Sequence, residues 1–427
     1  MIRPNDLLAL VPEKPAAGGR MLARHEGLVV LVAGAIPGER VRARVERVER
    51  SLAFARVEEV LDPHPSRRPV EGDPRCGGSV LAHIQYAEQC RLKGEVIRDA
   101  LARVGRIPIE GPIEVVPSPE TGYRMRARLH LRGGRAGFFL EGTHQVCDAA
   151  MTRQLLAETV RAAATVADRL WAGGFAADAD IEVSENRPGD QRAMHLDVAR
   201  EAAPGPIPPM GPVDGLTGLT WSAGERGPAH GLFGQPYVED VVRGVRLRRH
   251  ARAFFQGNRY LLDDLVAAVT GACPPGPVID LYAGVGLFGL CLAAGGGHQV
   301  VAVEDHDASA ADLEANAARL GNAVRVERTS VERFLARRHA RRPFTLVLDP
   351  PRTGMTREAA AGAVALKAAR VVFVSCDVAT LARDLRKFLD AGYQLDSVRG
   401  FDLFPNTAHV ETLAQLSKGD SPLLHLT

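Results

Sequence analysis

The first sixty residues alternate apolar and polar positions with a period of two, which is the pattern of β-strands. The clearest apolar stretches lie at residues 28–32, 41–45 and 53–57. Short strands at intervals of roughly 8–12 residues predict a small β-barrel over residues 1–62. Arg42 and Arg44 share one strand face, because alternate side chains point to the same side. That face suits RNA phosphates or solvent, and a single charge run favours solvent.

Residues 63–240 follow a proline-rich linker at 62–69 and mix two patterns. A period near 3.6 predicts a helix over residues 86–104, whose apolar positions are Ile97, Leu101 and Val104. Strand-like alternation returns at residues 124–131, where four basic side chains share one face. We expect an α+β domain with a role in RNA recognition. By itself the basic strand face is again expected to be solvated.

From residue 241 the chain alternates strand, turn and helix. Apolar strands are expected at residues 278–282, 300–304, 324–326, 345–349 and 371–375. Alternating βα units with apolar strands predict a doubly wound, mainly parallel sheet of the Rossmann-like α/β type over residues 241–427.

Composition adds little about partners. The 427 residues agree with two or three domains at about 150 residues each. Apolar residues make up 46% and charged residues 24%, the balance of a soluble globular protein, and the net charge is only +2. The sequence shows no signal-peptide pattern and no apolar run of roughly 18 residues. We therefore expect a cytoplasmic monomer without membrane association.

The six cysteines are widely dispersed, and the closest two stand fourteen positions apart. This spacing excludes a CxxC zinc knuckle and a dense disulfide framework. Thiols at this density fit a reducing compartment better than a secreted scaffold.

A glycine motif, Gly284-Val285-Gly286-Leu287-Phe288-Gly289, follows the first strand of the C-terminal region. Glycines at this point let the backbone approach a ligand at a helix N-terminus. Glu304 ends the next strand, where a carboxylate can bind a ribose diol. These features fit NAD and S-adenosylmethionine equally well, because a lone GxGxxG is a weak signal.

The fourth strand ends in Asp349-Pro350-Pro351-Arg352. Carboxyl ends of parallel strands line the ligand crevice, so Asp349 is expected to face cofactor or substrate. Enzymes that methylate exocyclic amines often have an aromatic residue where Arg352 stands, which argues against N-methylation.

Cys376 stands between the fifth strand and a helix expected near residue 379. Such a thiol is a nucleophile when the helix terminus lowers its pKa, although a buried structural thiol is the commoner case. His409 and Glu411 are expected to share a face of a strand-like segment. A thiol and a carboxylate that meet in one crevice indicate covalent catalysis with a separate proton acceptor.

The segment Phe254-Phe255-Gln256-Gly257-Asn258 places two amides beside two aromatic rings. These side chains suit hydrogen bonding and stacking of a base, or alternatively the start of an amphipathic helix. Residues 241–260 also contain six arginines and no acidic residue, which predicts a phosphate track.

In this order the motifs resemble those of the uracil-C5 RNA methyltransferase family, which uses S-adenosylmethionine. The N-terminal segment around Pro37-Gly38 resembles the TRAM domain, an OB-type RNA-binding barrel found in many of these enzymes. The resemblance implies that Cys376 is the nucleophile and Glu411 the proton acceptor. It further implies residues that hold S-adenosylmethionine, namely Gln256, Tyr282, Gly284, Gly286, Glu304 and Asp349, and residues that contact the uridine, namely Phe254, Asn258 and Arg352.

The sequence departs from the family pattern in two places. Val378 stands where the family usually has a proline after the nucleophile triplet. Many relatives also hold an iron–sulfur cluster with four cysteines. Here Cys76 and Cys147 match two of them, whereas Val70 and Ser79 occupy the other two positions. We expect no iron–sulfur cluster and no other metal site.

The leading hypothesis is a uridine-C5 methyltransferase acting on structured RNA. By analogy with the barrel-containing relatives we expect rRNA, in particular 23S rRNA, with tRNA as the alternative. Other hypotheses are a non-catalytic RNA-binding protein, a nicotinamide-dependent oxidoreductase and a cytosine-C5 methyltransferase. The joint presence of Cys376 and Glu411 argues against the first, and Asp349-Pro350-Pro351-Arg352 argues against the second.

Overall fold

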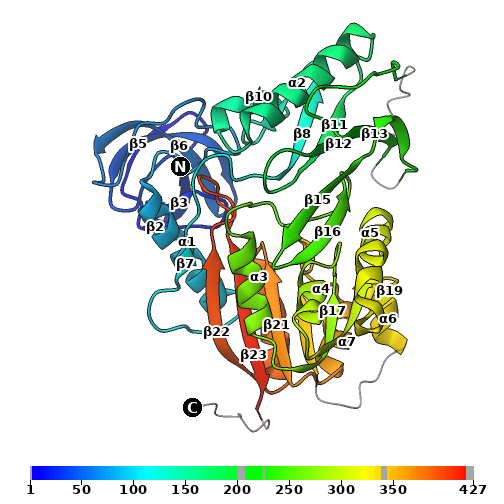
Figure 1. Cartoon of the computed structure of the whole chain (residues 1–427). Coiled ribbons are helices and arrows are strands. Elements are labelled where there is room, and N and C mark those ends of the chain that lie inside the picture. The colour runs from blue at the N-terminus through cyan, green and yellow to red at the C-terminus, as the bar shows by residue number, and fades with distance from the viewer. Residues whose placement is uncertain (1, 200–206, 225–226, 338–343, 420–427) are drawn as a thin grey trace.

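A computed structural model describes residues 2–199, 207–224, 227–337 and 344–419. Three parts follow one another along the chain (Figure 1): an N-terminal barrel, a central sheet with one long helix, and a C-terminal α/β domain. In the described ranges no helix combines the length and the apolar character needed to cross a membrane.

The N-terminal alternation forms a six-stranded sheet of order β1-β5-β6-β4-β3-β2. Its strands are β1 Leu7–Leu10, β2 Lys14–Pro15, β3 Met21–His25, β4 Leu28–Ala33, β5 Arg40–Glu49 and β6 Leu52–Asp62. Val41, Ala43 and Val45 of β5 are buried and Arg42 and Arg44 face outward, as predicted. These two arginines pair with Glu59 and Glu58 of the neighbouring strand. The basic face is therefore balanced by acidic side chains.

The central part contains a seven-stranded sheet of order β10-β9-β8-β11-β12-β13-β14, with helix α2 (Ala157–Ala172) packed against it. The strands are β8 Arg126–Arg132, β9 Arg135–Phe139, β10 Val146–Asp148, β11 Ala179–Glu185, β12 Arg192–Val198, β13 Gly218–Ala223 and β14 His230–Gly234. The basic face of β8 meets acidic residues of β11: Arg126 and Arg128 pair with Glu182, and His130 pairs with Asp180. Cross-strand pairs thus account for this basic face.

Helix α1 (Tyr86–Arg103) connects the barrel with the C-terminal domain. Its Leu92 belongs to the apolar core of the barrel, while Ile97 and Leu101 belong to a core of the C-terminal domain. Val104 lies beyond the last helical residue and is 50% exposed, so its expected burial was wrong. In Figure 1 the helix lies between the barrel and β22 (Tyr393–Phe401).

The C-terminal domain contains an eight-stranded sheet of order β19-β18-β17-β20-β21-β23-β22-β7. The five predicted strands are parallel neighbours in it: β17 Gly276–Leu281, β18 His298–Glu304, β19 Val324–Arg328, β20 Thr345–Leu348 and β21 Arg370–Ser375. Strand β23 (Glu411–Lys418) runs antiparallel to β21 and to β22, and β7 (Val115–Val116) adds an edge from the preceding region. The helices are α3 Leu262–Gly271, α4 Leu287–Ala294, α5 Asp307–Ala317, α6 Val331–Arg337, α7 Arg357–Ala365 and α8 Val378–Asp390. The predicted doubly wound, mainly parallel fold is confirmed.

Most of the six arginines of residues 241–260, which were expected to form a phosphate track, are paired with acidic side chains of the protein. A hairpin of β15 (Tyr237–Val242) and β16 (Val245–His250) supplies acidic partners from its first strand. Four of the arginines form ion pairs: Arg246 with Glu239, Arg248 with Asp312, Arg249 with Asp240 and Arg259 with Glu185. Residues 241–260 contain none of these acids, because Glu239 and Asp240 stand just before this segment and Glu185 and Asp312 lie far from it in sequence.

The hairpin offers a matched test of burial. Arg249 and Asp240 are both fully buried, whereas the Arg246–Glu239 pair is exposed. Arg249→Met leaves an unpaired carboxylate in the core, so we expect the free energy of unfolding to fall by about 3–5 kcal/mol. Arg246→Met on the same strand should cost less than about 1 kcal/mol. Urea denaturation of both variants measures the difference, and equal losses would contradict a structural role for the buried pair.

Candidate active site

The loop after β17 forms a cradle for a nucleotide-like ligand. Tyr282, Gly284 and Gly286 all have positive φ values of 63°, 57° and 98°. A Cβ atom at Gly286 would lie 2.5 Å from a Leu290 methyl carbon, so only glycine fits where the chain turns into α4. This turn exposes backbone N–H groups at a helix N-terminus, as the glycine motif predicted.

Glu304 closes the cradle from the end of β18. Its Oε2 accepts a hydrogen bond from the Gly284 N–H at 2.8 Å, and its Oε1 accepts one from the His306 N–H at 2.8 Å. Burial raises the pKa of this carboxyl, while these backbone bonds oppose the rise. A carboxylate fixed at this place can accept hydrogen bonds from the hydroxyl groups of a ribose.

A second carboxylate lies beneath the cradle. Asp280 is buried, and its Oδ2 accepts the Gly289 N–H at 2.9 Å. Within the described residues its Oδ1 has no hydrogen-bond partner. Burial, with the charges of Asp349 and Glu304, raises the pKa of Asp280 to about 7. An unpaired buried acceptor here fits a ligand that brings a cationic or N–H group, as the ammonium and sulfonium groups of S-adenosylmethionine do.

The strand register brings Cys376 and Glu411 together. Cys376 follows β21 directly, and Glu411 is the first residue of the neighbouring strand β23. Since Ser375 pairs with Thr412 in this antiparallel ladder, Glu411 lies opposite Cys376. Asp349 follows β20 on the other side of β21, so all three groups gather at one edge of the sheet.

Burial dominates the electrostatics of this group. It raises the pKa of the Cys376 thiol to about 12, and the charges of Glu411 and Asp349 act in the same direction. The expected lowering by the helix terminus is therefore outweighed. Burial also raises the pKa of Asp349 to about 7, opposed by a hydrogen bond from Gln256 Nε2 at 3.0 Å, and raises that of Glu411 well above its usual value.

The segment after Cys376 forms a capped helix start, although Val378 stands where the family usually has a proline. Helix α8 begins at Val378, and the Asp377 side chain caps it by accepting the N–H groups of Ala379 and Thr380. Val378 thus occupies the first helical position, the one place in a helix where proline is favoured. Valine and proline are both compatible with this helix start.

Three residues were expected to contact the substrate, and they lie in different surroundings. Phe254 is 51% exposed, with the Arg126 guanidinium over its ring at 5.5 Å. Arg352 is exposed, and its Nη2 lies 3.5 Å from His409 Nδ1. Both side chains are therefore open to solvent and available to a ligand.

Asn258 was expected to contact the base directly, and the structure contradicts this. Its side chain is fully buried, and it donates from Nδ2 to Ser118 Oγ and the Leu403 carbonyl. Its Oδ1 accepts the N–H groups of Tyr260 and Leu261. Asn258 therefore holds two loops together.

His409 is also placed differently from the prediction. It lies in a loop, because β23 begins only at Glu411. Burial lowers the pKa of His409 to about 4, and the nearby Arg352 contributes to this shift. The imidazole is consequently neutral at physiological pH.

The structure adds residues that support the site and that the motifs did not reveal. The loop of residues 402–410, which leads to Glu411, is contacted by helix α1 through Lys93 and Gln89. These pairs join positions more than 300 residues apart in sequence. The sequence contains one signal for these contacts. Gln89 and Lys93 recur at the same spacing of four residues as the apolar Ile97 and Leu101, so they share the face of the helix that packs against the protein.

The two retained cysteines of the cluster pattern form a disulfide. Cys76 and Cys147 are bonded with their Cα atoms 6.0 Å apart. The remaining four cysteines are free thiols. The described part of the chain contains no group of three or more His, Cys, Asp or Glu side chains suited to a metal ion. The donor set therefore does not fit an iron–sulfur cluster.

Comparison with known proteins agrees with these features. Residues 235–419 match the family model described as tRNA (Uracil-5-)-methyltransferase, and residues 9–57 match that of the TRAM domain. An uncharacterised RNA methyltransferase of Streptomyces avermitilis is 33% identical, covering 94% of this chain and 96% of the relative. One from Thermosynechococcus vestitus is 31% identical, with 93% and 95% covered.

A solved structure shows the same fold over nearly the whole chain. The Pyrococcus abyssi tRNA (uracil-54, C5)-methyltransferase, in complex with S-adenosyl-L-homocysteine, matches with a TM-score of 0.72 and 22% identity. The match covers 96% of this chain and all of the archaeal one.

The full-length relatives place the protein among the RNA methyltransferases. The family model narrows this class, and the chain belongs to the uracil-C5 RNA methyltransferase family, in the form that has an N-terminal TRAM domain. The resemblance deduced from the motifs is confirmed.

The electrostatics of Cys376 can be tested by alkylation. Because the Glu411 charge raises the pKa of the thiol, Glu411→Gln should lower it and enlarge the thiolate fraction. At pH 9 we expect Cys376 to react with iodoacetamide between roughly threefold and tenfold faster in the variant. Residue-resolved mass spectrometry measures the rate, with Cys90 as the internal control. An unchanged or slower rate at Cys376 would show that Glu411 does not act on this thiol.

Proposed function

We propose that this protein methylates C5 of a uridine in structured RNA, with Cys376 as nucleophile and Glu411 as the acceptor of the C5 proton. The observation that carries the proposal is the register of β21 and β23, which sets these two side chains opposite each other beside the glycine cradle. A separate thiol and carboxylate at one edge suit covalent catalysis with proton removal.

S-adenosylmethionine, when bound, supplies an electrophilic methyl group on a sulfonium sulfur. In the proposal Glu304 holds its ribose, and Tyr282, Gly284 and Gly286 shape the cradle. Gln256 orients Asp349 through their hydrogen bond. The Asp280 and Asp349 carboxyls favour a cation next to them, and a cation bound there lowers the cost of ionising Cys376.

The reaction follows from the weak nucleophilicity of uracil C5. The Cys376 thiolate, its proton released to solvent, would add to C6 and form a covalent bond, which converts the ring to an enolate. C5 of this enolate would take the methyl group as the methyl–sulfur bond breaks, and the electron pair of that bond would stay on the sulfur as a neutral thioether. Glu411 then takes the proton from C5. The electron pair of that C–H bond restores the C5–C6 double bond and expels the Cys376 thiolate. Burial raises the pKa of Glu411 well above its usual value, which makes its carboxylate a stronger base.

The target uridine has to leave its stack to reach Cys376. The exposed ring of Phe254 offers a surface on which a displaced base can stack. The Arg352 side chain is exposed as well. We assign RNA recognition to the barrel (residues 1–62) and the central domain (63–240), and methyl transfer to residues 241–427. We favour rRNA as substrate, with tRNA as the alternative, and a monomer in the cytoplasm.

A trapping experiment tests the mechanism and identifies the RNA. Glu411→Gln protein is incubated with S-adenosylmethionine and total RNA from cells lacking this enzyme, then denatured. Without a proton acceptor the methylated adduct cannot eliminate, so we expect a covalent protein–RNA band. Sequencing of the attached RNA identifies the molecule and the uridine.

Two controls define the outcome. Cys376→Ala combined with Glu411→Gln should give no band, with affinity for S-adenosylmethionine within about twofold of the single variant, since the thiol lies outside the cradle. A band in the double variant would remove Cys376 from the mechanism. No band in Glu411→Gln, together with no methylation by the wild type, would support a non-catalytic RNA-binding protein.

A further inference from the structure

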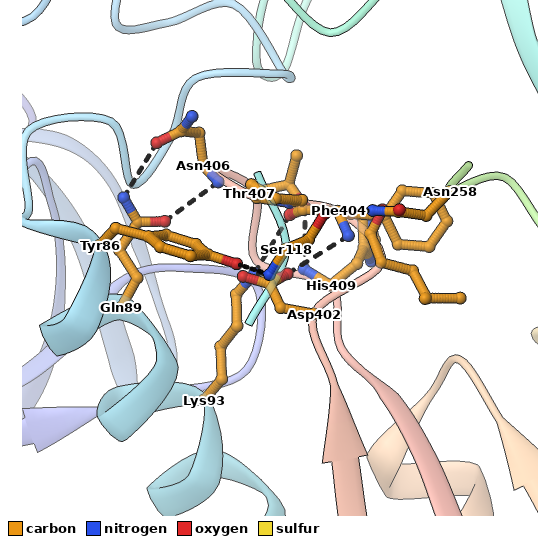
Figure 2. A network of polar contacts seen from close by, with 12 residues as sticks. Tyr86, Gln89, Lys93, Ser118, Asn258, Asp402, Phe404, Asn406, Thr407 and His409 are labelled. Atoms are coloured by element: carbon orange, nitrogen blue, oxygen red, sulfur yellow. Dashed lines mark hydrogen bonds and ion pairs between the residues drawn. The ribbon is translucent and has the colours of Figure 1, made fainter. Parts of the chain in front are cut away.

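A buried ion pair joins helix α1 to the loop that precedes Glu411. Lys93 Nζ lies 2.6 Å from Asp402 Oδ1, and the two side chains are 3% and 0% exposed. The same ammonium donates to the Phe404 carbonyl at 3.1 Å. Figure 2 shows Lys93 extending from the helix toward Asp402. Lysine and aspartate are rarely buried this completely unless they are paired.

From Asp402 a chain of hydrogen bonds runs along the loop toward the proposed proton acceptor. Asp402 Oδ1 also accepts the Phe404 N–H, and the Phe404 carbonyl accepts Thr407 Oγ1 at 2.7 Å. Thr407 Oγ1 in turn accepts the His409 N–H at 3.2 Å. The Lys93 ammonium thus begins a series of contacts that ends two residues before Glu411 (Figure 2).

A second branch reaches the loop of residues 254–258. The Tyr86 hydroxyl of α1 accepts the Ser118 N–H at 2.7 Å, and Ser118 Oγ accepts Asn258 Nδ2 at 2.8 Å. Asn258 also donates to the Leu403 carbonyl. The helix therefore fixes both the loop that carries Gln256 and the loop that leads to Glu411.

A neutral clamp supports the same loop one turn earlier on the helix. Gln89 Nε2 donates to Asn406 Oδ1 at 2.9 Å, and Gln89 Oε1 accepts the Asn406 N–H at 3.0 Å. The loop would keep this clamp if the ion pair were removed, so loss of the Lys93 charge should displace the loop without unfolding it.

We propose that Lys93 and Asp402 are positioning residues for proton removal, in that their ion pair sets the loop geometry that places Glu411 against Cys376. The inference rests on the proposed function for its catalytic consequence. A buried ion pair contributes little net stability compared with apolar residues of similar volume, but it specifies one geometry. Misplacement of a reacting group by about 1 Å costs on the order of a hundredfold in rate.

The test compares Lys93→Met, Asp402→Asn and the double variant with the wild type. We expect each single variant to lower kcat at least roughly tenfold, while KM for RNA and affinity for S-adenosylmethionine stay within about twofold. Because proton removal is the slowed step, the methylated protein–RNA adduct should accumulate, as in Glu411→Gln. The double variant leaves no unpaired buried charge and should recover part of the stability lost in Lys93→Met.

A measurement without RNA separates this inference from the proposed function. If the pair places Glu411 against Cys376, Lys93→Met should move the pH midpoint of Cys376 alkylation downward, in the same direction as Glu411→Gln. Glu39→Gln is the control. Glu39 is buried and forms an ion pair with Arg67, and the side-chain hydrogen bonds of both residues lie within residues 34–67. It should reduce thermal stability and leave the midpoint unchanged.

The outcomes are distinct. A lower alkylation midpoint in Lys93→Met supports the positioning role even if the wild type methylates no RNA, which would refute only the proposed function. An unchanged midpoint in Lys93→Met would overturn the positioning role. The role would also be overturned if Lys93→Met and Glu39→Gln lost activity in proportion to their loss of thermal stability and Lys93→Met accumulated no adduct.

Discussion

The site depends on the joint burial of groups that all carry negative charge when ionised. Asp280, Asp349, Glu411 and Cys376 influence one another at the carboxyl edge of the sheet, and burial raises the pKa of each. Such an arrangement is costly without a neutralising partner. A ligand that brings positive charge lowers this free-energy cost. The same charge lowers the cost of ionising the Cys376 thiol. The free protein is therefore poised for a cationic donor rather than reactive by itself.

The basic residues follow the opposite logic, because most of them are neutralised within the protein. Arginines of β5, β8 and β16 pair with acids on adjacent strands or helices. Glu141 of the central part likewise binds Arg20 and Arg56 of the barrel, fixing these two parts against each other. Local counts of positive charge consequently overstate an RNA-binding surface. The exposed ring of Phe254 is a feature of the surface that such counts do not capture.

Sequence reasoning succeeded where a contact is local or periodic. The strands of the C-terminal sheet, the glycine turn and the strand-end positions of Asp349 and Cys376 follow from alternation and from the rule that ligands bind at carboxyl strand ends. It did not find the partners of Asn258 and Arg248, because these partners lie in distant segments. The Lys93–Asp402 pair spans 309 positions, and a lysine in an apolar stripe shows that a partner exists without identifying it.

Two successive turns of α1 link the parts of the molecule. Leu92 packs in the barrel core, Lys93 reaches the loop before Glu411, and Ile97 packs in the C-terminal domain. An additional ion pair, Lys14 with Asp99, ties the barrel to the same helix. The barrel, the loop before Glu411 and the C-terminal core therefore all contact one helix, although they lie far apart in sequence.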